Sequence, residues 1–280
     1  MNIIKITYNA AIRRPIIIIL PAVLVFILSV INSYSPLMPI LLGISNATGA
    51  GFFEGIVAVL QLILDRQIIA GAAFLAAGAV LLVSLVSAIV LSGYFPIVAN
   101  TLEGRGKTGG DFLEGVRKYF FRLFTITLRA SLTAGLLVMV MVVAAVPAII
   151  ITRAAAVTKP ELMPAAVFVD ILTGMVLFFG YTFCKIYLLY WFPAAVKGLD
   201  RPFRLAKSLV DRNFFKLLAR LLIFDIVLAA ITILAFIIPV TIVKLLFGWV
   251  FTTAFVTVLT IFVFKSFSEI MVSDRQDDGS

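Results

Sequence analysis

The chain has no histidine, a single cysteine and few charged residues, which make up only 13% of its 280 positions. Histidine is the side chain that most often transfers protons near neutral pH or binds a metal, so its absence removes histidine-based acid–base catalysis and histidine metal sites. The lone Cys184 excludes an internal disulfide and a cysteine-held zinc ion. Neither a Walker-type glycine loop nor a dinucleotide-binding fingerprint is present. These absences predict a protein that is not an enzyme, has no catalytic residues, and uses no metal and no cofactor.

Apolar residues are abundant instead: they make up 62% of the chain, and the mean hydropathy is +1.17. A soluble domain carries about 25% charged residues, well above the share in this chain. Several continuous apolar runs reach ~20 residues, enough for a helix to cross a hydrocarbon core of ~30 Å. A transmembrane barrel would show alternating segments of ~10 residues. The predicted fold class is an all-α polytopic membrane protein, with a single membrane domain over residues 1–272.

Prolines and polar turns divide the apolar sequence into six predicted transmembrane helices. The polar tail, 273–280, is expected to be disordered. The six spans are expected at 15–31, 71–99, 123–151, 163–196, 217–240 and 248–267.

The distribution of positive charge predicts the orientation of these spans. Most of the 23 Lys and Arg residues lie in the N-terminal segment, in the connections after the second and fourth spans, and in the tail. Cytoplasmic segments of membrane proteins carry this excess, so both termini are predicted to be cytoplasmic, in the plasma membrane of a prokaryote. The opposite side carries only Arg66, Arg153, Lys159 and Lys244.

The connections after the second and fourth spans, here called the first elbow (101–122) and the second elbow (197–216), share one plan. Each follows a span that ends in Phe-Pro, contains a short basic amphipathic stretch and finishes with Phe-Phe. Apolar spacing with basic flanks is typical of a helix that lies in the membrane interface. We therefore expect 111–119 and 203–213 to form helices along the cytoplasmic surface, with Asp111 as an N-cap.

The elbows align as an internal repeat. Phe95-Pro96 matches Phe192-Pro193, and residues 116–122 match 210–216. A third copy is suggested at 12–17, where Arg14 takes the place of Lys118 and Arg212. Three copies of an amphipathic helix and two spans predict three parallel repeats. The alternative for the N-terminal copy is that every membrane interface selects basic residues followed by apolar ones.

This succession of span, Phe-Pro, basic amphipathic helix and Phe-Phe resembles the six-span membrane region of bacterial glycerophosphoryl diester phosphodiesterases and of related uncharacterised membrane families. The resemblance implies a six-span architecture and a connection with membrane lipids. The catalytic phosphodiesterase domain of that family has no counterpart in these residues, so its activity is not carried over.

Charged residues within predicted spans are costly and usually face the bundle interior. Lys185 and Asp225 lie ~12–14 Å from the cytoplasmic ends of consecutive antiparallel helices, so we expect a salt bridge between them. With Arg129 and Tyr181 they form a candidate polar cavity among spans three to five for an anionic or amphiphilic substrate. The alternative is that the ion pair fixes helix register while Arg129 reaches the interface. Asp170 has no obvious partner beyond Lys159 or Arg153.

Basic residues of the second elbow are a second candidate site. A basic helix at the membrane surface attracts anionic headgroups, although such residues also act as topology signals. The residues concerned are Arg201, Arg204, Lys207 and Arg212.

The long first outer connection, 34–70, is too apolar to remain unburied in water, and its run 52–64 is too short to span. It either caps a cavity with Glu54 or Gln61 facing inward, or anchors in the interface. Two functions remain open: a transporter or lipid-handling protein, and a non-catalytic scaffold or accessory subunit. The expected partners are membrane lipids with anionic headgroups, and a membrane-protein partner or a second copy of the chain, but no nucleic acid.

Overall fold

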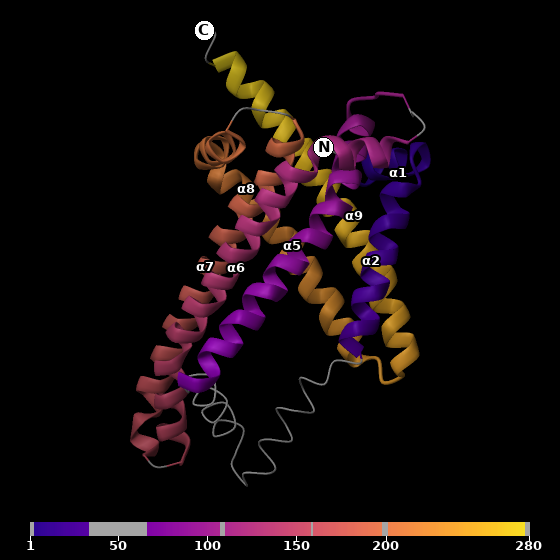
Figure 1. The fold of residues 1–280 in the computed structure, drawn as a ribbon. Helices are drawn as coiled ribbons and strands as arrows, with labels where there is room; N and C mark the ends of the chain where they lie inside the picture. Colours follow the sequence, from indigo (N-terminus) through magenta and orange to yellow (C-terminus); the bar gives the residue numbers. More distant parts are fainter. Residues whose placement is uncertain (1–2, 34–65, 107–109, 158, 198–200, 278–280) are drawn as a thin grey trace. The chain divides into compact units, whose positions relative to one another are not determined.

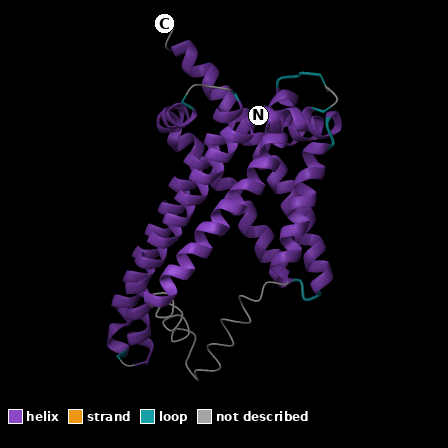
Figure 2. Cartoon of the chain, in the orientation of Figure 1, coloured by secondary structure: helices purple, strands orange, loops and turns teal. Residues whose placement is uncertain are grey.

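A computed structural model describes residues 3–33, 66–106, 110–157, 159–197 and 201–277. Regular structure within these ranges is entirely helical, without a strand (Figures 1 and 2). The all-α prediction is therefore confirmed for the described chain. The helices are α1 (Ile3–Arg13), α2 (Ile16–Ser33), α5 (Arg66–Leu102), α6 (Asp111–Val157), α7 (Met163–Val196), α8 (Pro202–Ile237) and α9 (Thr241–Asp277), with a 3-10 turn at Pro160–Leu162.

Five of the described helices, α5 to α9, are long and apolar enough to cross a membrane. α1 and α2 supply a sixth span if they are counted together, but they meet at an angle of 97°. The long apolar helices define an integral membrane protein. The six-span topology and the cytoplasmic termini stay predictions, although α1 begins and α9 finishes at one end of the same compact unit (Figure 1).

Several boundaries differ from those expected. α9 begins at Thr241, so the connection predicted at 241–247 is helical, and only the residues around Pro239 interrupt the chain. α9 also continues to Asp277, because no proline or glycine follows Gly248 before Gly279. Residues 273–277 are therefore helical instead of disordered. Glu54 and Gln61, with the rest of 34–65, lie outside the described residues, and 66–70 begin α5.

The chain divides into two compact units, each described by itself. The single membrane domain expected over 1–272 stays a prediction. Unit 1 comprises Met1–Tyr34, Leu85–Thr127 and Lys185–Ser280. Unit 2 comprises Ser35–Ser84 and Leu128–Cys184. In unit 1, α9 packs along α2 and α8 and also contacts α1. In unit 2, the Ser84 hydroxyl donates to Ser131 at 3.4 Å.

A proline inside α2 explains how unit 1 joins α2 to α5. Pro21 has no N–H to donate to the carbonyl of Ile17, four residues earlier. The hydroxyl of Tyr94 on α5 donates to that carbonyl instead, at 3.0 Å and fully buried. One turn further on, the indole of Trp249 on α9 donates to the Ala22 carbonyl at 2.7 Å. Two backbone carbonyls of α2 thus accept hydrogen bonds from side chains of α5 and α9.

Pro96 has the same effect inside α5, where it leaves the Ser92 carbonyl without its helical donor. Gly115 of the first elbow lies directly on this carbonyl: a Cβ at Gly115 would be 2.7 Å from the Ser92 oxygen. The neighbouring Gly93 likewise lies against the ring of Phe112. The start of α6 therefore lies beside the last third of α5, about nine residues or ~13 Å from its C-terminal end.

We expect Gly115→Ala to destabilise the protein by about 1–3 kcal/mol, because the Ser92 backbone cannot give way as a flexible side chain would. The matched control is Gly174→Ala in α7, where a Cβ would meet nothing within 4 Å. There the better helix propensity of alanine predicts up to ~1 kcal/mol of added stability. The melting temperatures of the two variants in detergent measure both effects. Equal shifts in Gly115→Ala and Gly174→Ala would contradict the close contact at Gly115.

The second elbow forms its own helical stretch at the start of α8. Asn213 has non-helical dihedral angles, so 202–212 and the rest of α8 are two stretches that meet at a kink. In Figure 1 the first stretch is seen nearly end-on while the remainder of α8 runs down the view. This first stretch buries three of its own residues, Ala206, Leu209 and Val210. The expected amphipathic helix is present, crosswise to the span that follows.

The aligned elbows share a pattern of burial as well as of sequence. Phe121 and Phe215, matched by the alignment, are 80% and 81% exposed. Leu123 and Leu217, two residues later, are both fully buried. The parallel repeat stays a prediction, but its two clearest copies place equivalent residues in equivalent surroundings.

Candidate functional site

The salt bridge predicted between Lys185 on α7 and Asp225 on α8 is present in unit 1. The Lys185 side chain is 14% exposed and that of Asp225 22%, so the pair is largely screened from its surroundings. Arg129 and Tyr181 belong to unit 2, and both are exposed. The four residues predicted as one cavity are therefore not gathered within one unit, and their joint role stays a prediction.

A polar pocket lies at the end of unit 1 where α5, α7 and α9 converge. Phe95, which directly precedes the lining residue Pro96, belongs to the core of this unit. Its ring centroid is 5.4 Å from that of Phe192 on α7 and 5.2 Å from that of Phe264 on α9. The pocket encloses about 260 Å³. Its lining residues are Pro96, Ala99, Asn100, Glu103, Arg105, Tyr119, Val196, Lys197 and Met271.

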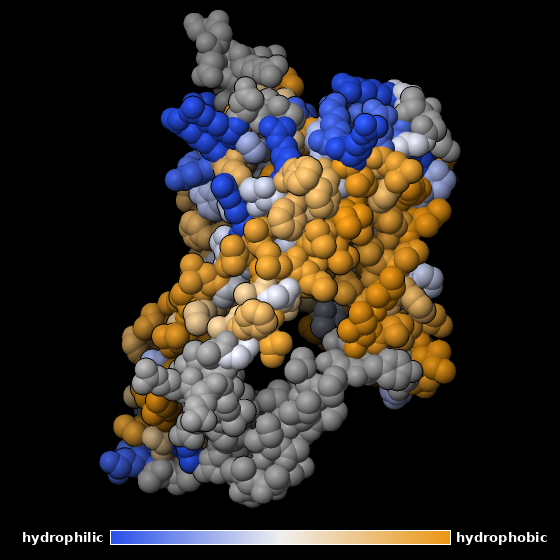
Figure 3. All heavy atoms as spheres, in the orientation of Figure 1, coloured by the Kyte–Doolittle hydropathy of each residue, from blue (hydrophilic) through white to orange (hydrophobic). Residues whose placement is uncertain are grey.

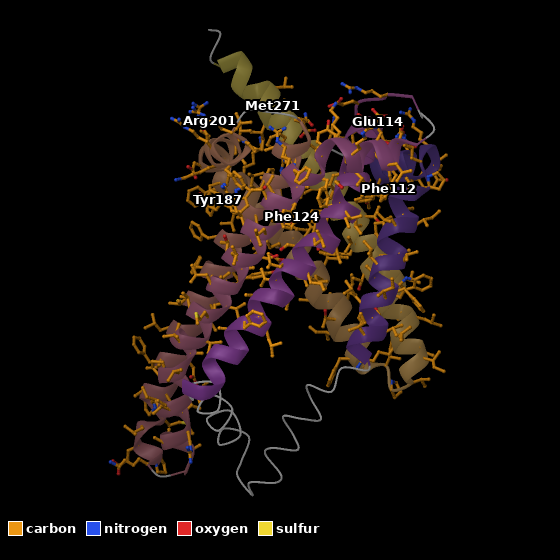
Figure 4. The ribbon with its side chains drawn as sticks, viewed as in Figure 1. Phe112, Glu114, Phe124, Tyr187, Arg201 and Met271 are labelled. Atoms are coloured by element: carbon orange, nitrogen blue, oxygen red, sulfur yellow. The ribbon has the colours of Figure 1, made fainter. Side chains whose placement is uncertain are left out.

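Two cations and one carboxylate face this pocket. Arg105 pairs with Glu103 at 3.1 Å, and both side chains are exposed. Lys197 donates to the Ser268 hydroxyl at 2.9 Å and lies over the Phe267 ring, 5.8 Å from its centroid. With Arg105 and Lys197 as cations and Glu103 as the carboxylate, the lining residues carry a net positive formal charge. Met271 stands at this end of the unit in Figure 4.

A buried arginine holds the rim of the pocket in place. Arg14, at the bend between α1 and α2, is 5% exposed and forms an ion pair with Asp111 at 2.6 Å. Its guanidinium also donates to the carbonyls of Arg105, at 3.3 Å, and Gly106, at 2.5 Å. Arg14 thereby ties the segment that carries Arg105 to the first residue of α6. Asp111, expected as an N-cap, lies inside α6 and serves as the partner of this arginine.

The basic residues predicted to bind headgroups are exposed on the first stretch of α8 or, for Arg201, immediately before it, and they do not line the pocket. Hydrophilic residues gather over this stretch and over the start of α6, where Figure 4 labels Glu114, above an apolar surface (Figure 3). On the same stretch Asp211 accepts a 2.5 Å hydrogen bond from the Tyr187 hydroxyl. The four residues are Arg201, Arg204, Lys207 and Arg212.

Sequence reasoning missed the pocket, although the repeat contained a signal for it. Asn100 follows Phe95 by five residues, and Lys197 follows Phe192 by the same number. Both are the first polar residue after an aligned Phe-Pro. In unit 2, Asp170 accepts a hydrogen bond from the Thr152 hydroxyl at 3.0 Å. Thr152 is a partner that the sequence analysis did not consider.

Comparison of the chain with models of known protein families, with curated proteins and with solved structures finds no match of any of the three kinds. The resemblance to the membrane region of glycerophosphoryl diester phosphodiesterases therefore stays an expectation from the sequence. The function proposed below rests on the pocket itself.

Proposed function

We propose that this integral membrane protein binds the anionic headgroup of a membrane amphiphile in the polar pocket of unit 1, without catalysing a reaction on it. The observation that carries the proposal is the net positive, polar lining of a 260 Å³ pocket in a predominantly apolar protein. Hydrogen bonds to ionised groups are the stronger kind, and Lys197 and Arg105 both supply charged donors. Asn100 and Tyr119 add neutral polar groups that can orient a headgroup.

The surroundings of the pocket support a lipid-like ligand over a fully soluble one. The pocket lies at the end of the unit where the basic elbow residues are exposed, and each such residue near a membrane surface contributes about 1 kcal/mol of attraction to anionic lipid. Arg204 and Lys207 would therefore concentrate anionic lipids around the pocket. Transport of the bound ligand stays a prediction of the sequence.

We expect Lys197→Gln to weaken the binding of phosphatidylglycerol by about tenfold, because a hydrogen bond to a charged group contributes ~1.5–3 kcal/mol. Native mass spectrometry of the protein titrated with this lipid in detergent measures the affinity. Lys207→Gln is the matched control: it removes the same charge from the exposed elbow, outside the pocket. In detergent at high salt, where the attraction of lipid to surface charge is screened, it is expected to change binding only slightly.

Two further arms complete this test. Competition by soluble glycerol phosphate would identify a free phosphate compound as the ligand, whereas resistance to it would identify a lipid. Equal affinities of wild type and Lys197→Gln would contradict the proposed pocket.

A second function, a scaffold that binds a membrane partner or a second copy, is favoured by the exposure of two helices. Only 6% of the most apolar stretch of α6, and likewise of α7, is buried within the chain, against 28% for α9. Co-purification of a stoichiometric protein partner, or a stable oligomer without bound lipid, would favour this function over headgroup binding.

A further inference from the structure

A second cavity of unit 1 differs from the polar pocket in position and in chemistry. It is a groove of about 470 Å³ between α1, α2 and α9, within the ~300–1,000 Å³ typical of small-molecule sites. Its walls are almost entirely apolar, with Ile4 and Tyr8 from α1, Ile18 and Ala22 from α2, and Trp249 and Ala254 from α9 among them. An apolar cavity of this size selects a hydrocarbon.

The bend between α1 and α2 creates this groove. α1 buries Thr7 and Ala10, yet Ile4, Tyr8 and Ile12 form an exposed apolar stripe at helical spacing. Because α1 turns 97° away from α2, this stripe lies across the axis of α2 instead of extending it. Such a stripe faces the apolar part of an interface, and a groove beneath it is open to a chain from the membrane.

One wall of the groove holds a polar group without a partner. Thr253 lines the groove and is 6% exposed, and its buried hydroxyl has no hydrogen-bond partner within the described structure. Leaving a buried hydroxyl unpaired is costly, so such a group points to a missing acceptor or donor. Threonine in a helix has two accessible rotamers, and a χ1 change offers the hydroxyl to a ligand in the groove.

We propose that this groove holds one acyl chain of a phospholipid as a tightly bound structural lipid, with its ester carbonyl accepting a hydrogen bond from Thr253. Charge favours an anionic phospholipid: Lys5 directly follows the lining residue Ile4, and Arg13 directly follows the exposed Ile12, so α1 carries cations beside its apolar stripe. This site goes beyond the headgroup pocket proposed above, shares no lining residue with it, and is tested separately.

The test counts phospholipids that remain on the protein after extensive washing in detergent, by native mass spectrometry with lipid identification. Wild type is expected to retain one phospholipid. Ala254→Phe places a ring in the groove from an exposed position and is expected to abolish retention. Ala230→Phe, at an exposed alanine of α8 outside the groove, is the matched control and is expected to retain the lipid.

Thr253→Val separates a lipid from an empty groove, because it keeps the shape of the side chain and removes only the hydroxyl. A bound ester predicts several-fold weaker retention. A lipid held elsewhere, with the groove empty, predicts unchanged retention and an unchanged or higher melting temperature. Lys197→Gln is expected to keep this lipid. Three results with the variants would each overturn the inference: loss of the lipid only in Lys197→Gln, retention of the lipid in Ala254→Phe, or equal loss of the lipid in Ala230→Phe. A stoichiometric protein that copurifies in place of the lipid would overturn it as well.

Discussion

Arg14→Ala is expected to destabilise the protein by about 3–5 kcal/mol, the largest effect of any single substitution considered. The guanidinium is 5% exposed and its partner Asp111 13% exposed, so removing Arg14 leaves a buried carboxylate without its cation. The carbonyls of Arg105 and Gly106 lose a charged donor at the same time. Breaking a buried pair on one side costs far more than the pair itself contributes.

Two measurements test this result. The melting temperature in detergent is expected to fall steeply, and trypsin is expected to cleave faster after Arg105, because Arg14 no longer holds that segment. Arg13→Ala is the matched control: it removes the same side chain at the adjacent exposed position, and a change within ~0.5 kcal/mol is expected there. Similar shifts for both variants would show that the contacts of Arg14 contribute nothing specific.

Lys185→Met and Asp225→Leu are each expected to cost about 2–4 kcal/mol, while the double variant recovers most of that loss. Each single substitution leaves one charge inside a membrane-spanning segment without its partner. The double variant removes both charges and fills their space with apolar atoms, which is often neutral or stabilising. A double-mutant cycle from melting temperatures measures the coupling, expected to be well above 1 kcal/mol.

The same cycle decides between the two interpretations of this pair. If the pair only fixes the register of α7 against α8, the double variant keeps both its stability and its bound phosphatidylglycerol. A stable double variant that loses this lipid would instead show that the pair is part of a ligand site. Additive losses would mean that Lys185 and Asp225 do not interact in the membrane.

The sequence by itself determined the class of the protein and the local character of its segments. Continuous apolar runs can only be satisfied as helices in lipid, because every backbone polar group must pair within the segment. The same logic matched Lys185 to Asp225, since helix rise fixes depth. Apolar spacing and Asn-Phe-Phe (213–215) likewise marked an amphipathic stretch that ends at a break, which the structure places at Asn213.

Tertiary structure alone decided which distant residues meet. Arg14 looked like one more topology signal until the bend after α1 placed it against Asp111, 97 positions away. The carbonyls freed by Pro21 and Pro96 were predictable, but their neighbours, the Tyr94 hydroxyl and Gly115, were not. Periodicity specifies the buried face of a helix, whereas its neighbours depend on packing among all the helices at once. Both cavities arise at such contacts between helices. The polar residue after each aligned Phe-Pro was a local sign of the polar pocket, but no local pattern showed which helices enclose either cavity.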